Sequence, residues 1–258
     1  MKYKQELIGD LCAADGIGDV ADRYAKQFLA LDALAMERGL RLYNRDLVWL
    51  NDPEFWGLWK KFPEWRRHRP ERKFMLWSLY RSVAHLGPCT AECGVYTGGS
   101  SFLICQEGER LGHLKKHFGF DSFEGLSEPT KIDMPTTEEA YLWAKGDLAV
   151  DEHHVRALLE PCRTAQLLKG WIPERFDEVG DAQFSFVHVD VDLYEPTLAS
   201  IEFFYPRLVP GGILLCDDYG AETCPGARRA LDEYCERFSL PPVVDLCSCQ
   251  GMMTKAFV

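Results

Sequence analysis

From about residue 90 onward, short apolar runs alternate with longer stretches of helical periodicity. Such alternation predicts βαβ units, and therefore a mostly parallel sheet with helices on both faces. Residues 184–189 are almost continuously apolar, which is typical of a strand buried on both sides. The runs 241–247 and 251–258 lie too close together for a crossover helix, so we expect an antiparallel hairpin there. The pattern predicts an α/β fold with a doubly wound sheet.

Residues 1–88 lack the β-branched runs of strands and are predicted to be helical. Met75, Leu79, Val83 and Leu86 recur at near-helical spacing, which predicts a helix with one buried face. Basic residues interleaved with aromatic ones precede this stripe: Lys60, Lys61, Arg66, Arg67, Arg69, Arg72 and Lys73. We interpret them as a solvated helix surface or a subunit contact rather than a nucleic-acid surface. The predicted division is a helical extension over 1–88 and an α/β domain over 89–258.

Composition restricts the class of protein further. The chain has 258 residues, 47% of them hydrophobic and 27% charged, with a formal net charge of -11. No stretch approaches the roughly 18 apolar residues of a membrane span, and the N-terminus lacks the apolar segment of a signal peptide. We therefore expect a cytoplasmic protein whose ten cysteines are reduced thiols. Its acidity counts against nucleic-acid binding, because contact with phosphates requires a basic surface.

A glycine-containing turn follows the first predicted strand, in the run from Glu92 to Ser100. Glycines there let a ligand approach the backbone, and the next helix offers free N–H groups. The E-x-G-x-x-x-G spacing differs from the G-x-G-x-x-G that binds the pyrophosphate of NAD. Asp121 ends the second strand, where an acid can accept both hydroxyls of a ribose. Because Glu92 repels a phosphate and suits a cationic amino-acid group, the two acids favour S-adenosylmethionine.

Acidic residues also end the predicted fourth and fifth strands, with Asp190 and Asp192 on one and Asp217 and Asp218 on the other. If these strands are neighbours, their carboxylates converge beyond the strand ends, where doubly wound sheets bind ligands. Gathered carboxylates repel each other unless a cation neutralises them, and an all-oxygen set suits Mg²⁺. The alternative for any one of them is a helix cap or a surface turn. We interpret His188 as a hydrogen-bonded core residue rather than a ligand.

Several motifs between residues 92 and 234 together resemble the macrocin O-methyltransferase (TylF-type) family of sugar methyltransferases. They are the run from Glu92 to Ser100, GFDSFEGL (119–126), LLKGWIP (167–173), VDVDLYEPT (189–197), LVPGGILLCDDYG (208–220) and ARRALDEY (227–234). The resemblance implies a class I methyltransferase (Rossmann-like) fold, S-adenosylmethionine as methyl donor and a bound Mg²⁺. It also implies Asp190, Asp217 and Asp218 as metal ligands and Asp192 as the general base. Positions that match the cofactor site are Glu92, Gly94, Gly98, Asp121, Gly170 and Trp171, with Val95, Thr97, Ser100 and Ser122 beside them.

The expected reaction methylates a hydroxyl of a sugar or another vicinal-diol small molecule, in natural-product or glycan biosynthesis. Residues 127–147 are predicted to form a lid over this acceptor, the alternative being an ordered helical insertion. Trp56, Trp59 and Trp65 are expected either at the interface of a homo-oligomer or in the core.

Two other functions compete with this one. An NAD(P)-dependent sugar oxidoreductase would share the first βαβ unit and the ribose-binding acid. A non-catalytic methyltransferase-like scaffold is the second alternative. The glycine spacing and the carboxylate cluster count against the oxidoreductase, and a scaffold has no need of mutually repelling acids. A metal-dependent hydrolase is a third alternative, and the lack of a group of histidines near the acids counts against it.

Overall fold

The computed structural model describes residues 20–37, 39, 49, 52–136 and 141–257. The chain divides into two compact units, residues 1–56 and 57–258. The first unit contains helix α2 (Val20–Glu37) and the beginning of α4 (Pro53–Trp59). The second unit contains every strand of the described chain, and it begins well before residue 89, where the sequence predicts the boundary.

In the described part of the chain, one sheet has the strand order β3-β2-β1-β4-β5-β7-β6. Its strands are β1 (Cys89–Cys93), β2 (Lys116–Asp121), β3 (Ala165–Lys169), β4 (Phe184–Val189), β5 (Leu208–Cys216), β6 (Val244–Asp245) and β7 (Gly251–Thr254). The first five strands are parallel to one another, whereas β7 runs antiparallel to both β5 and β6. The predicted doubly wound sheet with a C-terminal antiparallel hairpin is confirmed.

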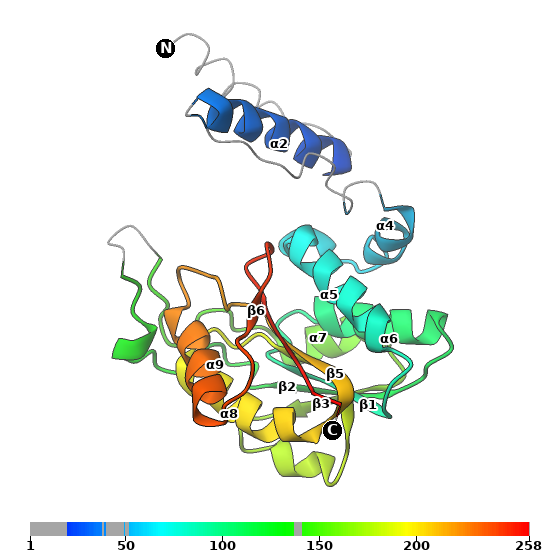
Figure 1. Ribbon diagram of the computed structural model, residues 1–258. Helices are drawn as coiled ribbons and strands as arrows, with labels where there is room; N and C mark the ends of the chain where they lie inside the picture. Colours follow the sequence, from blue (N-terminus) through cyan, green and yellow to red (C-terminus); the bar gives the residue numbers. More distant parts are fainter. Residues whose placement is uncertain (1–19, 38, 40–48, 50–51, 137–140, 258) are drawn as a thin grey trace. The chain divides into compact units, whose positions relative to one another are not determined.

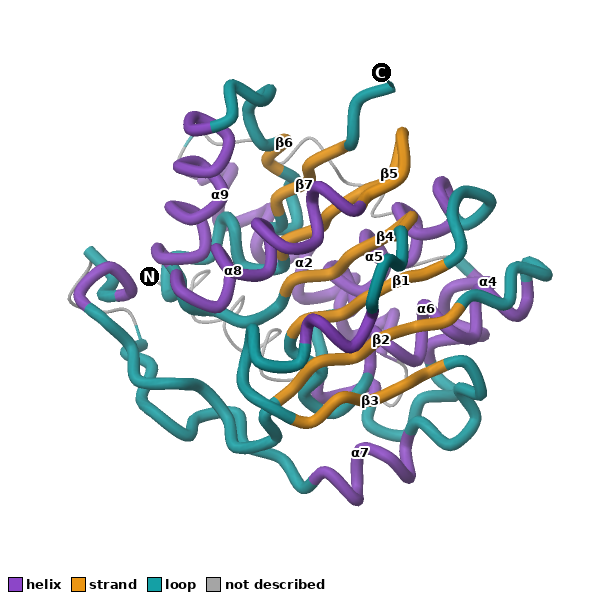
Figure 2. The backbone as a smooth tube through the Cα atoms, turned by 90° about the horizontal axis from the view of Figure 1, so that it is seen from below, coloured by secondary structure: helices purple, strands orange, loops and turns teal. Residues whose placement is uncertain are grey.

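Helices cover both faces of the sheet (Figure 1). On one face lie α5 (Pro70–Val83) and α6 (Gly99–Arg110). On the other lie α8 (Tyr194–Phe204), which Figure 2 draws in front of the strands, and α9 (Pro225–Arg237), which packs beside it. The shorter elements are α7 (Glu152–Leu158), η1 (Trp65–Arg67), η2 (Lys131–Asp133), η3 (Phe176–Val179) and η4 (Tyr205–Arg207). None of the described helices combines the length and the apolar character that crossing a membrane requires.

Aromatic side chains fill the core between the sheet and α8. Phe204 of α8 packs edge-on against Phe184 of β4 at 5.1 Å between ring centroids and contacts Phe120 of β2 at 5.7 Å. Phe176 of η3 completes the group, 5.0 Å from Phe120. All six residues of β4 are buried, as its continuous apolar run predicts. Edge-to-face packing at these distances adds to the free energy gained from burial.

Helix α5 is present as predicted, but its buried face differs from the expected stripe. Leu76, Trp77 and Tyr80 are at most 2% exposed, whereas Met75 and Leu79 are only partly buried. The larger aromatic rings occupy the interface because they bury more apolar area, and Tyr80 packs edge-on against Phe186 of β4. Val83 of the predicted stripe is buried as expected, whereas the rest of the buried face is shifted by one residue, from Met75 and Leu79 to Leu76 and Tyr80.

The three tryptophans whose role the sequence leaves open are buried. Trp56, Trp59 and Trp65 are at most 8% exposed, and Trp59 stacks on Phe62 at 5.6 Å. Their burial favours the core interpretation over an exposed subunit interface.

Backbone hydrogen bonds align the carboxyl ends of the neighbouring strands. The residue after each strand donates to a carbonyl of the next: Gly170 to Asp121 (2.9 Å), Gly94 to Phe120 (2.9 Å), Asp190 to Cys93 (2.8 Å) and Asp217 to Val189 (2.8 Å). This register brings the ends of β2, β1, β4 and β5 to one edge of the sheet, where doubly wound folds bind ligands.

Candidate functional site

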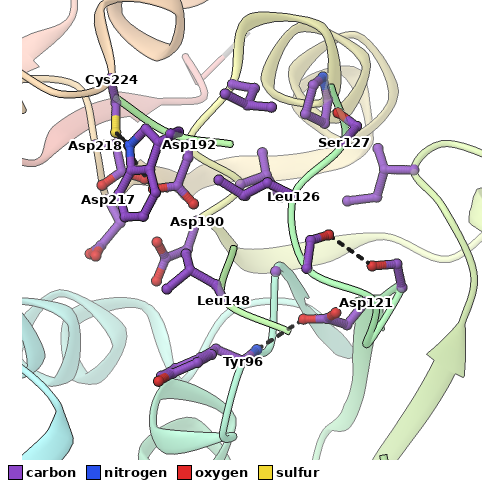
Figure 3. Close-up of a pocket in the computed structure, with 18 of the residues that line it drawn as sticks. Tyr96, Asp121, Leu126, Ser127, Leu148, Asp190, Asp192, Asp217, Asp218 and Cys224 are labelled. Carbon is purple, nitrogen blue, oxygen red and sulfur yellow. Dashed lines mark hydrogen bonds between the residues drawn. The ribbon is translucent and has the colours of Figure 1, made fainter. Parts of the chain in front are cut away.

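A cavity of about 640 Å³ lies at this edge of the sheet. Strand ends form its floor, with Gly94 after β1, Asp121 of β2, Asp190 after β4 and Asp217 after β5 among the lining residues. In Figure 3, Asp121 and Tyr96 lie at one end and the aspartates that follow β4 and β5 lie toward the other. Three strand spacings separate β2 from β5, or about 14 Å. A ligand of that length can reach both ends.

Gly94 is required where the floor of the cavity is most crowded. Its φ is +84°, and a Cβ atom there would lie 1.8 Å from the backbone oxygen of Asp190. Only glycine allows β1 and β4 to approach this closely at their ends. Gly98, with a φ of +94°, is the N-cap of α6. The turn between strand and helix therefore presents backbone rather than side chain to part of the cavity.

Asp121 fixes the conformation of the glycine turn. Its Oδ2 accepts hydrogen bonds from the backbone N–H groups of Val95 (2.7 Å) and Tyr96 (2.9 Å), and its Oδ1 accepts one from Phe123 (2.7 Å). Burial raises the pKa of this carboxyl, an effect that the three backbone donors oppose. A carboxylate has about four acceptor positions, so one on Oδ1 remains for a ligand. Asp121 thus both shapes the turn and offers an acceptor.

The predicted cofactor residues divide into two groups. Gly94, Asp121, Ser122 and Trp171 line the cavity. The others are not among its lining residues: Glu92, Val95, Thr97, Gly98, Ser100 and Gly170.

The polar members of the second group have protein partners. Thr97 Oγ1 lies 2.8 Å from His68 Nε2, and Ser100 Oγ accepts a hydrogen bond from Lys73 at 2.6 Å. Glu92 is 1% exposed and bonded to His188 and Ser101. A direct role of these residues in cofactor binding stays a prediction.

The four predicted acidic residues meet in the cavity wall. Ligand atoms of His188, Asp190 and Asp217 lie within 4.8 Å of one another, and so do those of Asp192, Asp218 and Cys224. Asp192 has a φ of +60°, an unusual conformation that points to a local constraint at this strand end. The convergence that neighbouring strands predict is therefore present, with the acids in two adjoining groups.

The environment separates the acids electrostatically. Burial, together with the neighbouring Asp217 and Asp218, raises the pKa of Asp190 to about 8. Burial and Asp218 also hold the pKa of Asp192 well above its usual value. Burial opposes ionisation of Asp217 too, but Lys73, Arg72 and His188 hold its pKa well below the usual range. Asp217 is the carboxylate with the greatest positive charge around it.

Two side chains of α5 supply much of that positive charge. Arg72 Nη2 lies 2.7 Å from Asp217 Oδ2 and 2.9 Å from Asp218 Oδ1. Lys73, which is 5% exposed, places Nζ 3.7 Å from Asp190 Oδ2. The interpretation of these basic residues as a solvated surface is therefore wrong for Arg72 and Lys73. A usable signal existed, because Lys73 shares the helical face of Leu76, Trp77 and Tyr80.

His188 links the acidic residues to the core. It is fully buried on β4, with Nδ1 3.0 Å from Glu92 Oε1 and Nε2 3.3 Å from Asp217 Oδ1. Burial favours the neutral ring, but the two carboxylates outweigh it and raise the pKa of His188 to about 9. The interpretation of His188 as a hydrogen-bonded core residue agrees with these contacts.

The segment predicted as a lid contributes to the opposite wall of the cavity. Ser127 and Trp143 of this segment line the cavity, and so do Leu126 and Leu148, which flank it, while residues 137–140 lie outside the described part of the chain. Backbone hydrogen bonds join its two ends, from Leu126 N to Asp147 O (2.8 Å) and from Gly146 N to Leu126 O (2.9 Å).

A side-chain contact joins the same segment to the acidic end of the cavity. Trp143 Nε1 donates to Cys224 Sγ at 3.3 Å, and this thiol lies 3.5 Å from Asp192 Oδ1 (Figure 3). Sequence reasoning missed both Trp143 and Cys224, because neither belongs to a motif.

Comparison with protein families decides between the interpretations of this site. A family model described as macrocin-O-methyltransferase (TylF) matches residues 87–247, more than half of the chain. The chain belongs to the macrocin O-methyltransferase family. The match contains the glycine turn and all four aspartates, as the sequence motifs predict. It favours methyltransferase over the oxidoreductase alternative.

Named relatives are O-methyltransferases of actinomycete natural products. The chain is 31% identical over 155 residues to 8-demethyl-8-(2,3-dimethoxy-alpha-L-rhamnosyl)-tetracenomycin-C 4'-O-methyltransferase of Streptomyces olivaceus. It is 28% identical over 163 residues to demethyldecarbamoylnovobiocin O-methyltransferase of Streptomyces niveus. Each match covers 58% of this chain and spans 58% of the relative's length.

A solved structure extends the likeness in fold. The calicheamicin methyltransferase CalS11 superposes with a TM-score of 0.63 at 19% identity, over 92% of this chain and 94% of that one. At that identity the likeness shows the fold alone, which is that of a class I methyltransferase.

Proposed function

We propose that this protein is an S-adenosylmethionine- and Mg²⁺-dependent O-methyltransferase. Its acceptor would be a hydroxyl of a sugar or another small molecule with a vicinal diol, in natural-product or glycan biosynthesis. The observation that carries the proposal is a single cavity with the glycine turn and Asp121 at one end and four carboxylates toward the other. The family and the rhamnose-bearing acceptor in the name of one relative support a sugar-like substrate.

The donor set suits a divalent cation such as Mg²⁺. Asp218 Oδ2 is buried without a hydrogen-bond partner among the described residues, and such an orphaned oxygen is costly unless a ligand completes it. Asp190 Oδ2 is 3.7 Å from Lys73 Nζ, beyond ordinary hydrogen-bond distance. Asp217 keeps one acceptor position after its bonds to Arg72, His188 and Gln250. Asp190, Asp217 and Asp218 would hold the ion.

When bound, the sulfonium cofactor supplies an electrophilic methyl group and the metal lowers the pKa of a coordinated hydroxyl. The chain's own residues would do the rest. Asp192 would take the hydroxyl proton on its carboxylate, for which a raised pKa is an advantage in a base. Leu126, Trp143 and Leu148 would exclude water from the acceptor end of the cavity. Asp121 and Gly94 would orient the cofactor, so much of the rate gain is positional.

One experiment tests the cofactor and the reaction together. Thermal unfolding is followed with S-adenosylhomocysteine or with NADH, since a ligand specific for the folded state raises the melting temperature. Mass spectrometry then follows methylation of rhamnose-bearing glycosides and nucleotide sugars, with MgCl₂ or with EDTA. We expect stabilisation by S-adenosylhomocysteine alone and methylated product that EDTA abolishes.

Asp192→Asn provides the catalytic arm of the same experiment. It should lower kcat by about 100-fold or more while cofactor affinity stays close to that of the wild type. Asp245→Asn, on the exposed strand β6, is the matched control and should leave kcat unchanged. Stabilisation by NADH instead would overturn the cofactor assignment, and full turnover in EDTA would remove the metal.

A further inference from the structure

A continuous chain of buried polar side chains crosses the sheet beneath the cavity. Glu92 of β1, His188 of β4 and Asp217 after β5 are joined in sequence at 3.0 and 3.3 Å. Glu92 and His188 are register partners in neighbouring parallel strands, so their side chains emerge on the same face of the sheet. All three are at most 4% exposed. These hydrogen-bonded side chains therefore connect a core position of β1 to a cavity-lining carboxylate two strands away.

The far side of Glu92 is fixed as well. Ser101 of α6 donates to Glu92 Oε2, and the same hydroxyl lies 2.9 Å from His117 Nε2. The other ring nitrogen of His117 lies 2.9 Å from Thr90 Oγ1. Both carboxylate oxygens of Glu92 thus have protein partners, and Glu92 does not line the cavity. Each oxygen keeps a further acceptor position, but a side chain that is 1% exposed and does not line the cavity is not within reach of a ligand there.

Stability alone does not account for an ionisable group at this position. Ala91 and Cys93, the neighbours of Glu92 on β1, are fully buried small residues. Burying a carboxylate and an imidazole costs more than burying apolar side chains of similar volume, even when the two are paired. What the chain of polar groups provides in return is orientation.

Asp217 is the residue that receives this orientation. His188 and Gln250 both reach its Oδ1, the latter at 2.5 Å, and Arg72 reaches Oδ2 at 2.7 Å. These contacts leave the carboxylate little rotational freedom, and one acceptor position remains on a residue that lines the cavity. Residues that hydrogen-bond to a metal ligand in this way set its direction and its affinity for the ion.

We propose that Glu92 and His188 are positioning residues for Asp217, and that Glu92 acts through His188 rather than by contacting the cofactor. The proposal rests on the proposed function, because it assigns Asp217 to the metal. It gives Glu92 a role that differs from the one implied by its place beside the glycine turn.

The test compares metal affinity with cofactor affinity in the same variants. Mn²⁺ is titrated into the full chain and followed by electron paramagnetic resonance, and S-adenosylhomocysteine binding is measured by calorimetry. Glu92→Gln should weaken Mn²⁺ binding by about 10- to 100-fold and change S-adenosylhomocysteine affinity less than about 2-fold. Thr197→Val is the matched control, an equally buried polar residue that lies on α8 outside this set of hydrogen bonds and does not line the cavity, and it should change neither affinity.

A double variant shows whether Glu92 acts through the imidazole. His188→Gln keeps an N–H donor for Asp217 and loses the contact with Glu92. If the pathway runs through His188, adding Glu92→Gln to this variant should weaken Mn²⁺ binding no further. A further loss equal to that of the single variant would overturn the pathway.

The orientation of Asp217 gives a readout that does not depend on metal. Crystals of metal-free Glu92→Gln with S-adenosylhomocysteine should show the Asp217 carboxylate rotated from its wild-type position. An unchanged rotamer overturns the positioning role, and so does a loss of S-adenosylhomocysteine affinity with Mn²⁺ affinity retained. If wild-type protein binds no Mn²⁺, the proposed metal requirement fails, and the crystals still decide the positioning role.

Discussion

The four aspartates of the cavity are balanced by protein cations as well as by any bound metal. Arg72 lies within 2.9 Å of both Asp217 and Asp218, and His188 contacts Asp217 from below the cavity. Repulsion between carboxylates is therefore not by itself a sufficient argument for Mg²⁺. The orphaned Oδ2 of Asp218 is the more specific sign of an incomplete site.

A single methyl group at Gly94 should disable the site. In Gly94→Ala, the new Cβ would fall 1.8 Å from the Asp190 backbone oxygen, in a conformation that alanine rarely adopts. We expect a loss of about 2–4 kcal/mol of unfolding free energy and loss of S-adenosylhomocysteine binding, because β1 and β4 must separate. Urea denaturation and calorimetry measure the two effects.

Gly112→Ala is the control for that substitution. Gly112 has a similar φ of +75°, but nothing lies within 4 Å of its Cβ position. It should cost about 1–2 kcal/mol from backbone strain and leave ligand binding intact. Equal losses in both variants would show that the crowding between Gly94 and Asp190 has no part in the effect.

At the scale of elements, local signals predicted the strands and the acidic half of the site. Each pair of acids directly follows its own strand in the sequence, one pair after β4 and one after β5. Because β4 and β5 are neighbouring parallel strands, the sheet brings the two pairs together. The cationic half was missed, although the helical face that Lys73 shares with Leu76, Trp77 and Tyr80 is a local signal for its burial. Arg72 and Lys73 reach the acids because of the way α5 packs on the sheet. The face of α5 that contacts the sheet is offset from the apolar stripe predicted from the sequence, and tertiary packing determines it.

The segment between β2 and α7 is tied to α8 through one buried carboxylate. Asp133 Oδ1 accepts from Tyr194 N at 2.7 Å, and Oδ2 accepts from Thr130 N and Oγ1 at 2.9 Å each. Asp133→Ala leaves the Tyr194 N–H without this acceptor and should cost about 1–3 kcal/mol of unfolding free energy. It should also speed chymotrypsin cleavage beside Tyr141, an exposed residue of the same segment.

Lys131→Ala is the matched control in the same short turn, since Lys131 is exposed and has no part in these bonds. It should leave both the unfolding free energy and the cleavage rate near those of the wild type. Wild-type cleavage in Asp133→Ala would contradict the role of Asp133 as the attachment point.

At the scale of the whole molecule, the site belongs to one of the two units. The residues that line the cavity fall between Arg67 and Cys224, within the unit 57–258. The family match, residues 87–247, begins later and leaves out α5. The family boundaries therefore leave out residues of this chain that line the cavity, Arg72 and Lys73 of α5 among them.

Two truncated chains test whether the folded, ligand-binding unit begins near residue 57 or at residue 89. The chain 52–258 keeps all of α4, with Asp52 accepting from Phe55 N at 2.8 Å, and should bind S-adenosylhomocysteine with affinity within a few-fold of the full chain. The chain 89–258 removes α5, exposes the sheet face that Trp77 and Tyr80 cover, and removes the partners of Asp217 and Asp218. Because that uncovers apolar area and leaves carboxylates unpaired, it should fail to give a cooperative thermal transition. A folded, ligand-binding 89–258 would instead support the boundary that the sequence predicts.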